Sequence, residues 1–271
     1  MGEDDRMVND VRLVDRLASD LRDEFEEVLK LAQGADMRQQ TPAVGWDIRR
    51  TVEHLHSSDL SARIAIADPE KFLAERPRRP DEFRAMHQRQ SENLSGLNDA
   101  ELLEAWREGL ERLLATALAA APETRHPWYG PPMSISSSLT ARLMEYWAHG
   151  EDIADARGVQ RSPSPRLRHI CHLGVRTYAF SFRNRDLLAP VGEPRVELTS
   201  PTGDLWVWGH EDAADAVRGD ALDFARLVTR RRHRSDTTLQ TNGANADAWL
   251  DIAQCFAGPP GAGRAPRNGE Q

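Results

Sequence analysis

The sequence predicts a mainly helical α+β protein, in which an N-terminal four-helix bundle is followed by a small α+β domain. Long segments in the first 160 residues repeat apolar side chains at steps of three and four, which is typical of amphipathic helices. The pattern changes after the proline-rich segment at 161–165. Beyond it, a short stretch alternates apolar and polar residues on both sides of "SPTGD", which indicates a β-hairpin.

The N-terminal domain, residues 1–160, is expected to hold four long helices joined by loops. Asp47 is the expected N-cap of the second helix, and Asn98 or Asp99 that of the third. The segment "RPRRPDE" at 76–82 predicts a connector broken by proline. Four helices in this order favour an antiparallel bundle. They are expected over residues 11–32, about 47–67, about 99–121 and about 137–157.

The second domain is expected over residues 165–260, with residues 261–271 as a disordered tail. A helix over about 166–186 comes first, and the hairpin follows it. The segment "AVRGDALDFARLVTRRR" then predicts a short strand, a Gly-Asp turn and a helix. A last helix is expected in "ANADAWLDIAQCFAG".

The composition argues against several classes of protein. A net charge of −8 over 271 residues disfavours a nucleic-acid partner, which binds a basic face. The apolar runs are short and interrupted by charge, so no membrane span is expected. The N-terminus does not have the pattern of a secretory signal, so we expect a cytoplasmic protein. Cys171 and Cys255 lie outside any CxxC motif and are expected to be small core residues.

The segment "LMEYWAHGEDI" at 143–153 carries a line of polar side chains through an otherwise apolar helix. Glu145, His149 and Asp152 fall at i, i+4 and i+7, so they share one helix face. A Glu–His pair at this spacing also occurs on many solvated helix faces, so the pair alone does not identify a metal site. Asp152 is then either a surface acid or a residue that orients a metal ligand or a substrate.

A ligand from a facing helix would complete a metal site in the bundle. His54 lies on the second helix, in "RRTVEHLHSSD", and His56 is the alternative if that helix is rotated. His54, Glu145 and His149 together make a His₂Glu set. Three protein ligands with one open position are the arrangement of catalytic zinc sites. Nickel, iron or manganese would accept the same ligands.

Several stretches resemble a known family. The segment "TPAVGWDIRRTVEHL" resembles a motif of the DinB-like metalloproteins, and "TARLMEYWAHGEDIADARG" resembles the fourth-helix motif of their mycothiol-dependent maleylpyruvate isomerase branch. The segments "VRGDALDFARLVTRR" and "WLDIAQCFAGPPGAGR" are similar to the C-terminal domain of an actinobacterial subgroup of that branch. Only Lys30 and Lys71 are lysines among the 35 Lys and Arg residues, which fits a GC-rich source of this kind.

The resemblance implies a DinB-like bundle that binds a divalent metal, usually zinc, through His54, Glu145 and His149. It also implies that mycothiol is a thiol cosubstrate activated at the open metal position. A metal-bound thiol loses its proton near neutral pH, and the thiolate is the nucleophile. Because the bundle domain contains no cysteine, the sulfur has to come from outside the chain. An arginine in the C-terminal domain would help to hold the substrate, and its counterpart is Arg230 or Arg231.

Four aromatic or apolar side chains are further candidates for the site. Trp46 either forms a wall of the site or packs in the core. The other three precede the fourth helix and either line the entrance or only cover the end of the bundle. They are Trp128, Tyr129 and Met133.

The predicted function is that of a metal- and mycothiol-dependent enzyme, which transfers the thiol to a small electrophile or isomerises it, in detoxification or specialised metabolism. Its partners are a small-molecule substrate and a low-molecular-weight thiol, and the protein is expected as a monomer or homodimer. Two alternatives stay open. Metal-bound water could be the nucleophile of a hydrolase or lyase. The chain could also be a non-catalytic metal- or ligand-binding protein, which a closed site with Asp152 as fourth ligand would favour.

Overall fold

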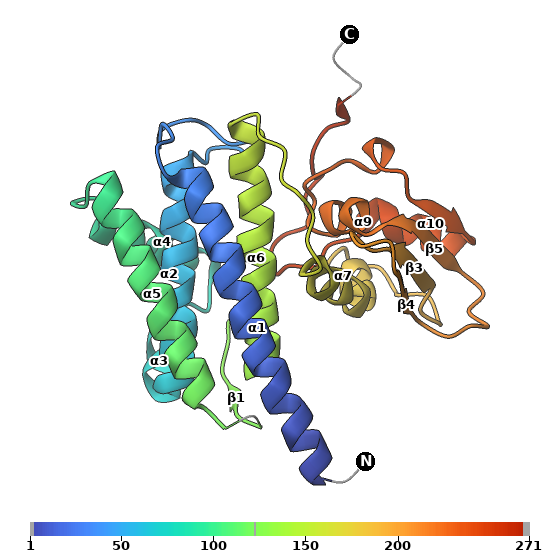
Figure 1. Cartoon of the computed structure of the whole chain (residues 1–271), viewed down its shortest axis with the longest axis horizontal. Coiled ribbons are helices and arrows are strands. Elements are labelled where there is room, and N and C mark those ends of the chain that lie inside the picture. Colours follow the sequence, from blue (N-terminus) through green and yellow to red (C-terminus); the bar gives the residue numbers. More distant parts are fainter. Residues whose placement is uncertain (1–2, 122, 268–271) are drawn as a thin grey trace. The chain divides into compact units, whose positions relative to one another are not determined.

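The computed structural model describes residues 3–121 and 123–267, and the chain divides into two compact units, residues 1–160 and 161–271 (Figure 1). The predicted fold class, α+β with mainly helix, is confirmed, because the strands described form only one short hairpin and one four-stranded sheet. None of the helices described combines the length and the apolarity that crossing a membrane requires.

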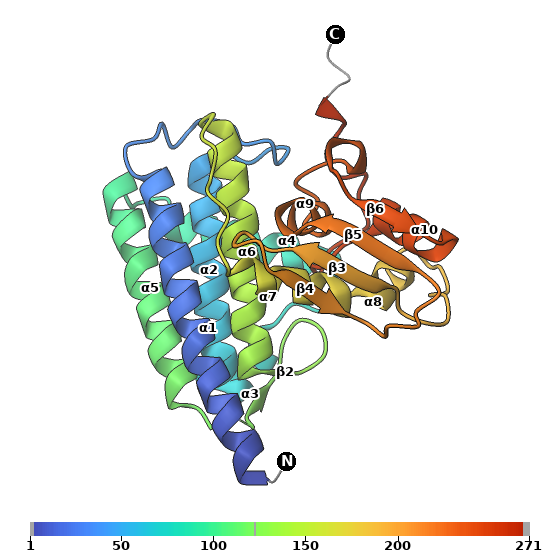
Figure 2. The same cartoon turned by 45° about the vertical axis from the view of Figure 1, so that its right-hand side comes forward.

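Four long helices build the first unit, and the connections between them carry shorter elements (Figures 1 and 2). α1 packs chiefly against α6, and α2 chiefly against α5. The long helices are α1 (Glu3–Ala32), α2 (Ile48–Ala67), α5 (Asp99–Ala119) and α6 (Ile135–Ala156). The shorter elements are α3 (Pro69–Glu75), α4 (Pro80–Leu94), β1 (Arg125–His126) and β2 (Met133–Ser134).

Aromatic side chains fill the centre of the bundle. The rings of Phe25 and Trp106 meet edge to face, with centroids 4.7 Å apart. The indole Nε1 of Trp106 donates a 2.7 Å hydrogen bond to the hydroxyl of Tyr146, so the polar edges of both rings are paired inside the core. Tyr146 directly follows Glu145 in α6, so this packing fixes the rotation of α6 and the direction in which its polar side chains point.

The connector predicted over 76–82 is only partly correct, because α4 begins at Pro80. Proline is favoured at the first position of a helix, where its missing N–H has no intrahelical partner to lose. The side chain of Glu82 accepts hydrogen bonds from the backbone N–H groups of Arg78 and Arg79 at 2.7 and 3.3 Å, which stabilises this helix start. The proline that suggested an interruption is therefore the beginning of an additional helix.

The second unit places a mixed sheet beside short helices. The strand order is β4-β3-β5-β6; β3 is antiparallel to β4, as the predicted hairpin requires, and parallel to β5. The core of the second unit contains Tyr178, Phe224 and Trp249, all buried. The helices are α7 (Leu167–Arg176), α8 (Tyr178–Arg183), α9 (Ala221–Val228) and α10 (Ala244–Ile252). The strands are β3 (Arg195–Thr199), β4 (Leu205–Trp208), β5 (Ala216–Asp220) and β6 (Gln240–Asn242).

Two predictions for the second unit are wrong in detail. The helix expected over 166–186 is divided at Thr177, whose hydroxyl donates to the carbonyl of Leu173 at 2.8 Å, a contact that bends helices. The Gly-Asp turn expected after the next strand is replaced by a continuous β5, and Asp220 at its end is the N-cap of α9. β6 was not predicted, because three residues are too few to show an alternating pattern.

Part of the tail that was expected to be disordered makes defined contacts. The carbonyl of Gly261 accepts hydrogen bonds from Arg230 at 2.6 Å and from Arg185 at 3.3 Å. The backbone N–H of Arg267 donates to Asp236 at 2.9 Å. The remainder of the expected tail, residues 268–271, lies outside the described residues.

The close packing of α2 against α5 can be tested at Gly109. A Cβ added to Gly109 would lie 2.8 Å from Nδ1 of the buried His56. Alanine ordinarily stabilises a helix interior relative to glycine by about 1 kcal/mol. Here overpacking reverses the sign, so we expect Gly109→Ala to lower the free energy of unfolding by about 1–3 kcal/mol in urea denaturation. Gly96→Ala is the control, because an added Cβ there meets nothing within 4 Å. Equal or higher stability of Gly109→Ala would contradict this packing.

Candidate metal centre

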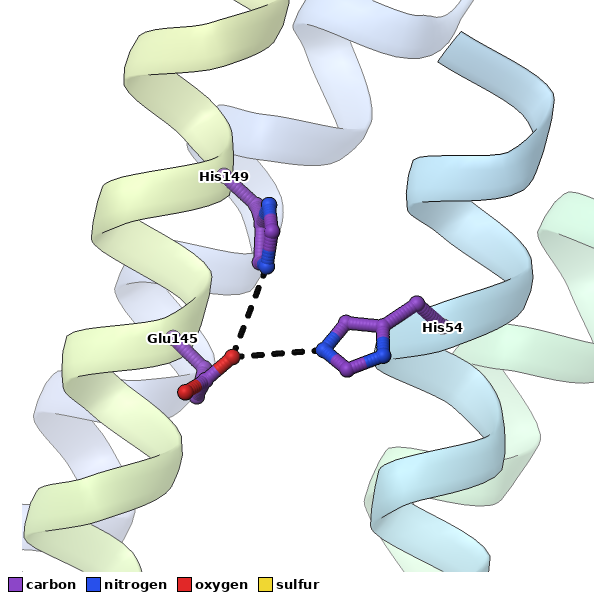
Figure 3. Close-up of side chains that lie close together, drawn as sticks. All are labelled: His54, Glu145 and His149. Atoms are coloured by element: carbon purple, nitrogen blue, oxygen red, sulfur yellow. Dashed lines mark hydrogen bonds and ion pairs between the residues drawn. The ribbon is translucent and has the colours of Figure 1, made fainter. Parts of the chain in front are cut away.

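The candidate metal ligands lie on two facing helices, α2 and α6, and point toward one another (Figure 3). α2 begins after Asp47, the predicted N-cap, whose carboxylate accepts a 2.7 Å hydrogen bond from the backbone N–H of Arg50. Val52 and Leu55 are fully buried, which directs that side of α2 into the core. His54 is partly buried, at the edge of this apolar face.

One carboxylate oxygen links the three candidate ligands. Oε2 of Glu145 lies 3.2 Å from Nε2 of His54 and 3.4 Å from Nε2 of His149 (Figure 3). One ligand atom from each residue lies within 4.8 Å of the other two. Two imidazole nitrogens and a carboxylate oxygen are the donors of many catalytic zinc sites, so the residues present fit a divalent ion.

The protonation states of His54 and Glu145 at neutral pH suit the binding of a cation. Burial lowers the pKa of His54 to about 4, although the hydrogen bond to Glu145 acts in the opposite direction. Burial alone would raise the pKa of Glu145, but hydrogen bonds with His149 and His54 outweigh it and hold this pKa well below its usual value. At neutral pH the imidazole of His54 is therefore uncharged and the carboxylate of Glu145 is ionised. These are the forms that bind metals.

Asp152 contacts His149 on the ring nitrogen that faces away from Glu145. Its Oδ2 lies 3.1 Å from Nδ1 of His149, and its carboxylate is buried. If Nδ1 donates to this carboxylate, the lone pair of His149 is on Nε2 and faces Glu145. Asp152 is not one of the three converging groups. Its role in orienting His149 stays a prediction, for which this contact supplies the geometry.

Trp46 lies against both histidines and borders a pocket. Its ring is parallel to the ring of His149, with centroids 5.5 Å apart and an interplanar angle of 2°. It meets the ring of His54 edge to face at 5.0 Å. The guanidinium of Arg50 lies over the indole, 5.5 Å from its centroid. The pocket is lined by Trp46, Arg50, Glu53, His54, Ser57, His87, Gln90 and Ser91, from α2, α4 and the turn before α2.

The pocket residues on α4 were missed by sequence reasoning. His87, Gln90 and Ser91 fall at i, i+3 and i+4, a spacing that places them on one helix face. This signal was present in the sequence, but the helix that carries it was not predicted. The polar character of the pocket follows directly from these side chains.

His56, the alternative ligand, is directed away from the cluster. Its ring packs against Gly109 of α5, and it is not among the converging groups. Two residues along an α-helix correspond to about 200° of rotation, so His54 and His56 face nearly opposite directions. Between these two histidines, the structure therefore brings only His54 to Glu145 and His149.

The candidates that precede α6 pack over other helices. Trp128 stacks on Phe72 of α3, with ring centroids 5.7 Å apart. The hydroxyl of Tyr129 donates to Oγ of Ser61 on α2 at 3.2 Å. Met133 belongs to β2, where it pairs with β1. Their proposed role at an entrance stays a prediction.

Arg230 and Arg231 come directly after Thr229, the C-cap of α9, in the second unit. Arg230 has a φ of 61°, a left-handed conformation that non-glycine residues adopt only at a cost. Arg231 donates from Nη1 to the carbonyl of Thr229 at 2.7 Å. A role for either arginine toward the substrate stays a prediction.

The fold and the convergent His₂Glu group define a DinB-like helical bundle with a candidate site for a divalent metal. A sequence profile of the mycothiol maleylpyruvate isomerase N-terminal domain matches residues 18–154, and the chain belongs to this family.

Known proteins extend this similarity to most of the chain. Uncharacterized proteins from two strains of Mycobacterium tuberculosis are 44% identical to it over 224 residues, which cover 83% of this chain and 87% of theirs. The solved structures of a mycothiol-dependent maleylpyruvate isomerase and of a histidine-to-alanine variant have TM-scores of 0.58, with 14% and 13% identity. Each match covers 84% of this chain and 92% of the other. At this identity, the structural likeness shows a common fold.

Metal binding can be tested on the three ligand positions. We expect the protein supplied with zinc to bind one ion per chain, and His54→Ala, Glu145→Gln and His149→Ala to lose it in native mass spectrometry. Asp152→Asn should weaken zinc affinity by about 10–100-fold in competition with a chelator, because the orientation of His149 is lost. His56→Ala is the control and should keep the ion. Zinc retained by all three ligand variants would rule out this site.

The pKa of His54 predicts a pH dependence of stability. The folded chain protonates His54 only near pH 4, whereas the unfolded chain does so near pH 6.5, so the unfolded state binds more protons between these values. The contribution of His54 to the free energy of unfolding is therefore fully present above about pH 6.5 and is lost as the pH falls toward 4. In urea denaturation without metal, His54→Gln should lose less stability between pH 7 and pH 5 than the wild type. Equal losses would mean that His54 titrates normally in the folded protein.

Proposed function

We propose that the protein is a metal- and mycothiol-dependent enzyme that transfers the thiol to a small electrophile or isomerises that electrophile. The observation that carries the proposal is the convergence of His54, Glu145 and His149 beside a polar pocket. Family membership and the mycothiol dependence named for the structural neighbours support the choice of thiol. Zinc is the ion we expect from this donor set, and nickel, iron or manganese are the other candidates.

In this proposal each residue near the ion has a distinct task. His54, Glu145 and His149 would hold the ion, and the ion would supply the site at which the thiol is activated. A divalent ion held there would lower the pKa of that thiol, so that the thiolate is available near neutral pH. Asp152 keeps His149 oriented through Nδ1, and the ring of Trp46 covers one side of both histidines.

The sulfur nucleophile is supplied from outside the chain. Both cysteines, Cys171 and Cys255, are buried in the second unit, and the first 160 residues contain none. Burial raises the pKa of the Cys171 thiol well above its usual value, which disfavours a reactive thiolate there. The pocket beside His54 presents amide, imidazole, guanidinium, carboxylate and hydroxyl groups, which can form hydrogen bonds with polar groups of a ligand at its mouth.

The reaction forms a carbon–sulfur bond. The thiolate sulfur supplies the electron pair to an electrophilic carbon. In S-transfer, a leaving group departs with the displaced electron pair, or the neighbouring carbon takes up the proton that the thiol released. In isomerisation, the same carbon–sulfur bond breaks again after rotation about the former double bond, and the thiol is regenerated. We place this reaction in the cytoplasm, where low-molecular-weight thiols are kept reduced.

Native mass spectrometry with and without mycothiol tests the proposal. We expect one zinc ion per chain and a further mass shift equal to one mycothiol, and both should disappear in His149→Ala. His56→Ala is the matched control and should keep both. Consumption of mycothiol with monobromobimane by the zinc-loaded protein would indicate S-transfer, whereas conversion of maleylpyruvate without net loss of mycothiol would indicate isomerisation.

Two results would contradict the thiol proposal. Zinc binding without any mycothiol adduct, together with turnover of a substrate in the absence of thiol, would indicate a hydrolase or lyase that uses water. Zinc binding without thiol binding or turnover would indicate a non-catalytic metal-binding protein. Asp152 contacts Nδ1 of His149, the nitrogen that faces away from Glu145. This contact disfavours Asp152 as the fourth ligand of a closed site.

A further inference from the structure

His87 of α4 is a titratable side chain in the pocket beside the candidate metal centre. It lines this pocket together with His54 of α2. Within residues 3–121 and 123–267, the ring of His87 makes no hydrogen bond and no ion pair. The residue is exposed, so its ring is accessible to a small molecule and to water. An imidazole whose nitrogens are not engaged by the protein can accept a proton and donate it again.

The other two groups of this pocket that could carry a proton already have partners or a task. The carboxylate of Glu53 accepts hydrogen bonds from Nε of Arg49 at 3.0 Å and from Oγ of Ser91 at 2.9 Å. It therefore holds α2 and α4 together. His54 is a candidate metal ligand. Among the pocket residues that the structure describes, His87 is the group left for proton transfer.

The contact between α4 and α2 fixes the place of His87. His87 precedes Ser91 by four residues, so the two side chains share one face of α4. Ser91 donates to Glu53, which directly precedes His54 on α2. The two helices are thus joined beside the candidate metal centre. His87 is held one helical turn from that junction.

Arg50 influences the protonation state of His87. Its guanidinium lies over the indole of Trp46, 5.5 Å from the ring centroid, and Trp46 meets the ring of His54 edge to face. Burial lowers the pKa of His87, and the positive charge of Arg50 lowers it further. Arg50 itself stays protonated. At neutral pH the imidazole of His87 is therefore mainly uncharged and ready to accept a proton.

Addition of a thiol across a polarised carbon–carbon double bond needs such a proton carrier. The S–H bond breaks, and the sulfur uses its electron pair to form a bond to one carbon. The electron pair of the double bond moves toward the neighbouring carbon, which then takes up a proton. The proton that the thiol releases is the one that this carbon needs. A base that accepts it and later donates it therefore balances the reaction without a further reactant.

We propose that His87 is a catalytic residue that takes the proton of the thiol and returns it to the carbon next to the new carbon–sulfur bond. The proposal rests on the proposed function, because it needs the thiol at the His54–Glu145–His149 centre. It separates two kinds of S-transfer. Addition to a double bond depends on His87 for the carbon-bound proton, whereas displacement of a leaving group requires no proton on carbon.

Two electrophiles that differ in this requirement test the role of His87. 2-Cyclohexenone gains a proton on carbon when the thiol adds to it, whereas monobromobimane releases bromide. We expect His87→Gln to lower kcat of the zinc-loaded protein by about 100-fold with 2-cyclohexenone and by less than about tenfold with monobromobimane. His210→Gln is the matched control, because this side chain of the second unit is 79% exposed, and it should change neither rate.

Two further measurements separate proton transfer from a structural role. Added imidazole should restore the 2-cyclohexenone rate of His87→Ala, because it supplies the missing base in the vacated space. In metal-free wild type, the His87 ring should titrate below the usual histidine value in NMR spectra. Native mass spectrometry should show the same zinc and mycothiol content in His87→Gln as in the wild type.

Three results would overturn the proposal. No loss of rate in His87→Gln would make His87 a solvated surface residue. Equal losses with both electrophiles would assign it to the binding of the thiol. A rate that imidazole does not restore in His87→Ala would exclude proton transfer as its task. Failure of the proposed function is a separate result, because the wild type itself would then lack zinc or mycothiol, and the role of His87 would fail with it.

Discussion

The first unit depends on the pairing of buried polar side chains between α2 and α6. A polar group inside a helical bundle destabilises the fold unless a partner meets it, and two of the pairs here join α2 to α6. Glu145 meets His54, and Arg142 meets Asp59. These two pairs are compatible with only one rotation and one axial register of the two helices. The geometry of the candidate metal centre therefore follows from helix packing, not from the conformation of a loop.

The long helices and the Glu145–His149–Asp152 line could be predicted because both are local properties of the sequence. Apolar periodicity and the cap at Asp47 define helix positions without reference to the rest of the fold. The choice between His54 and His56 is different, since it depends on how α2 is rotated against α6 and α5. Residue patterns did not distinguish between the two histidines. Only the family resemblance predicted that His54 is the ligand.

The features that were missed depend on tertiary contacts. Pro80 reads as an interruption in the sequence, although it starts α4, and the pocket side chains of that helix were lost with it. An arginine on a helix is usually solvated, and the sequence around Arg142 contains no pattern that predicts its burial against Asp59. The break at Thr177 and the three-residue β6 are likewise short features that neighbouring elements define.

His149 and Glu145 differ in the freedom of their side chains to move. The ring of His149 lies 3.1 Å from the carboxylate of Asp152 at one edge, and the ring of Trp46 lies parallel to it on one face. The carboxylate of Glu145 can instead offer one oxygen or both to a cation. An ion that prefers five or six donors would therefore be accommodated by rotation of Glu145, without displacement of either helix. If these residues hold a metal, they would not select it strictly by ionic radius, and its identity would follow the supply of ions around the protein.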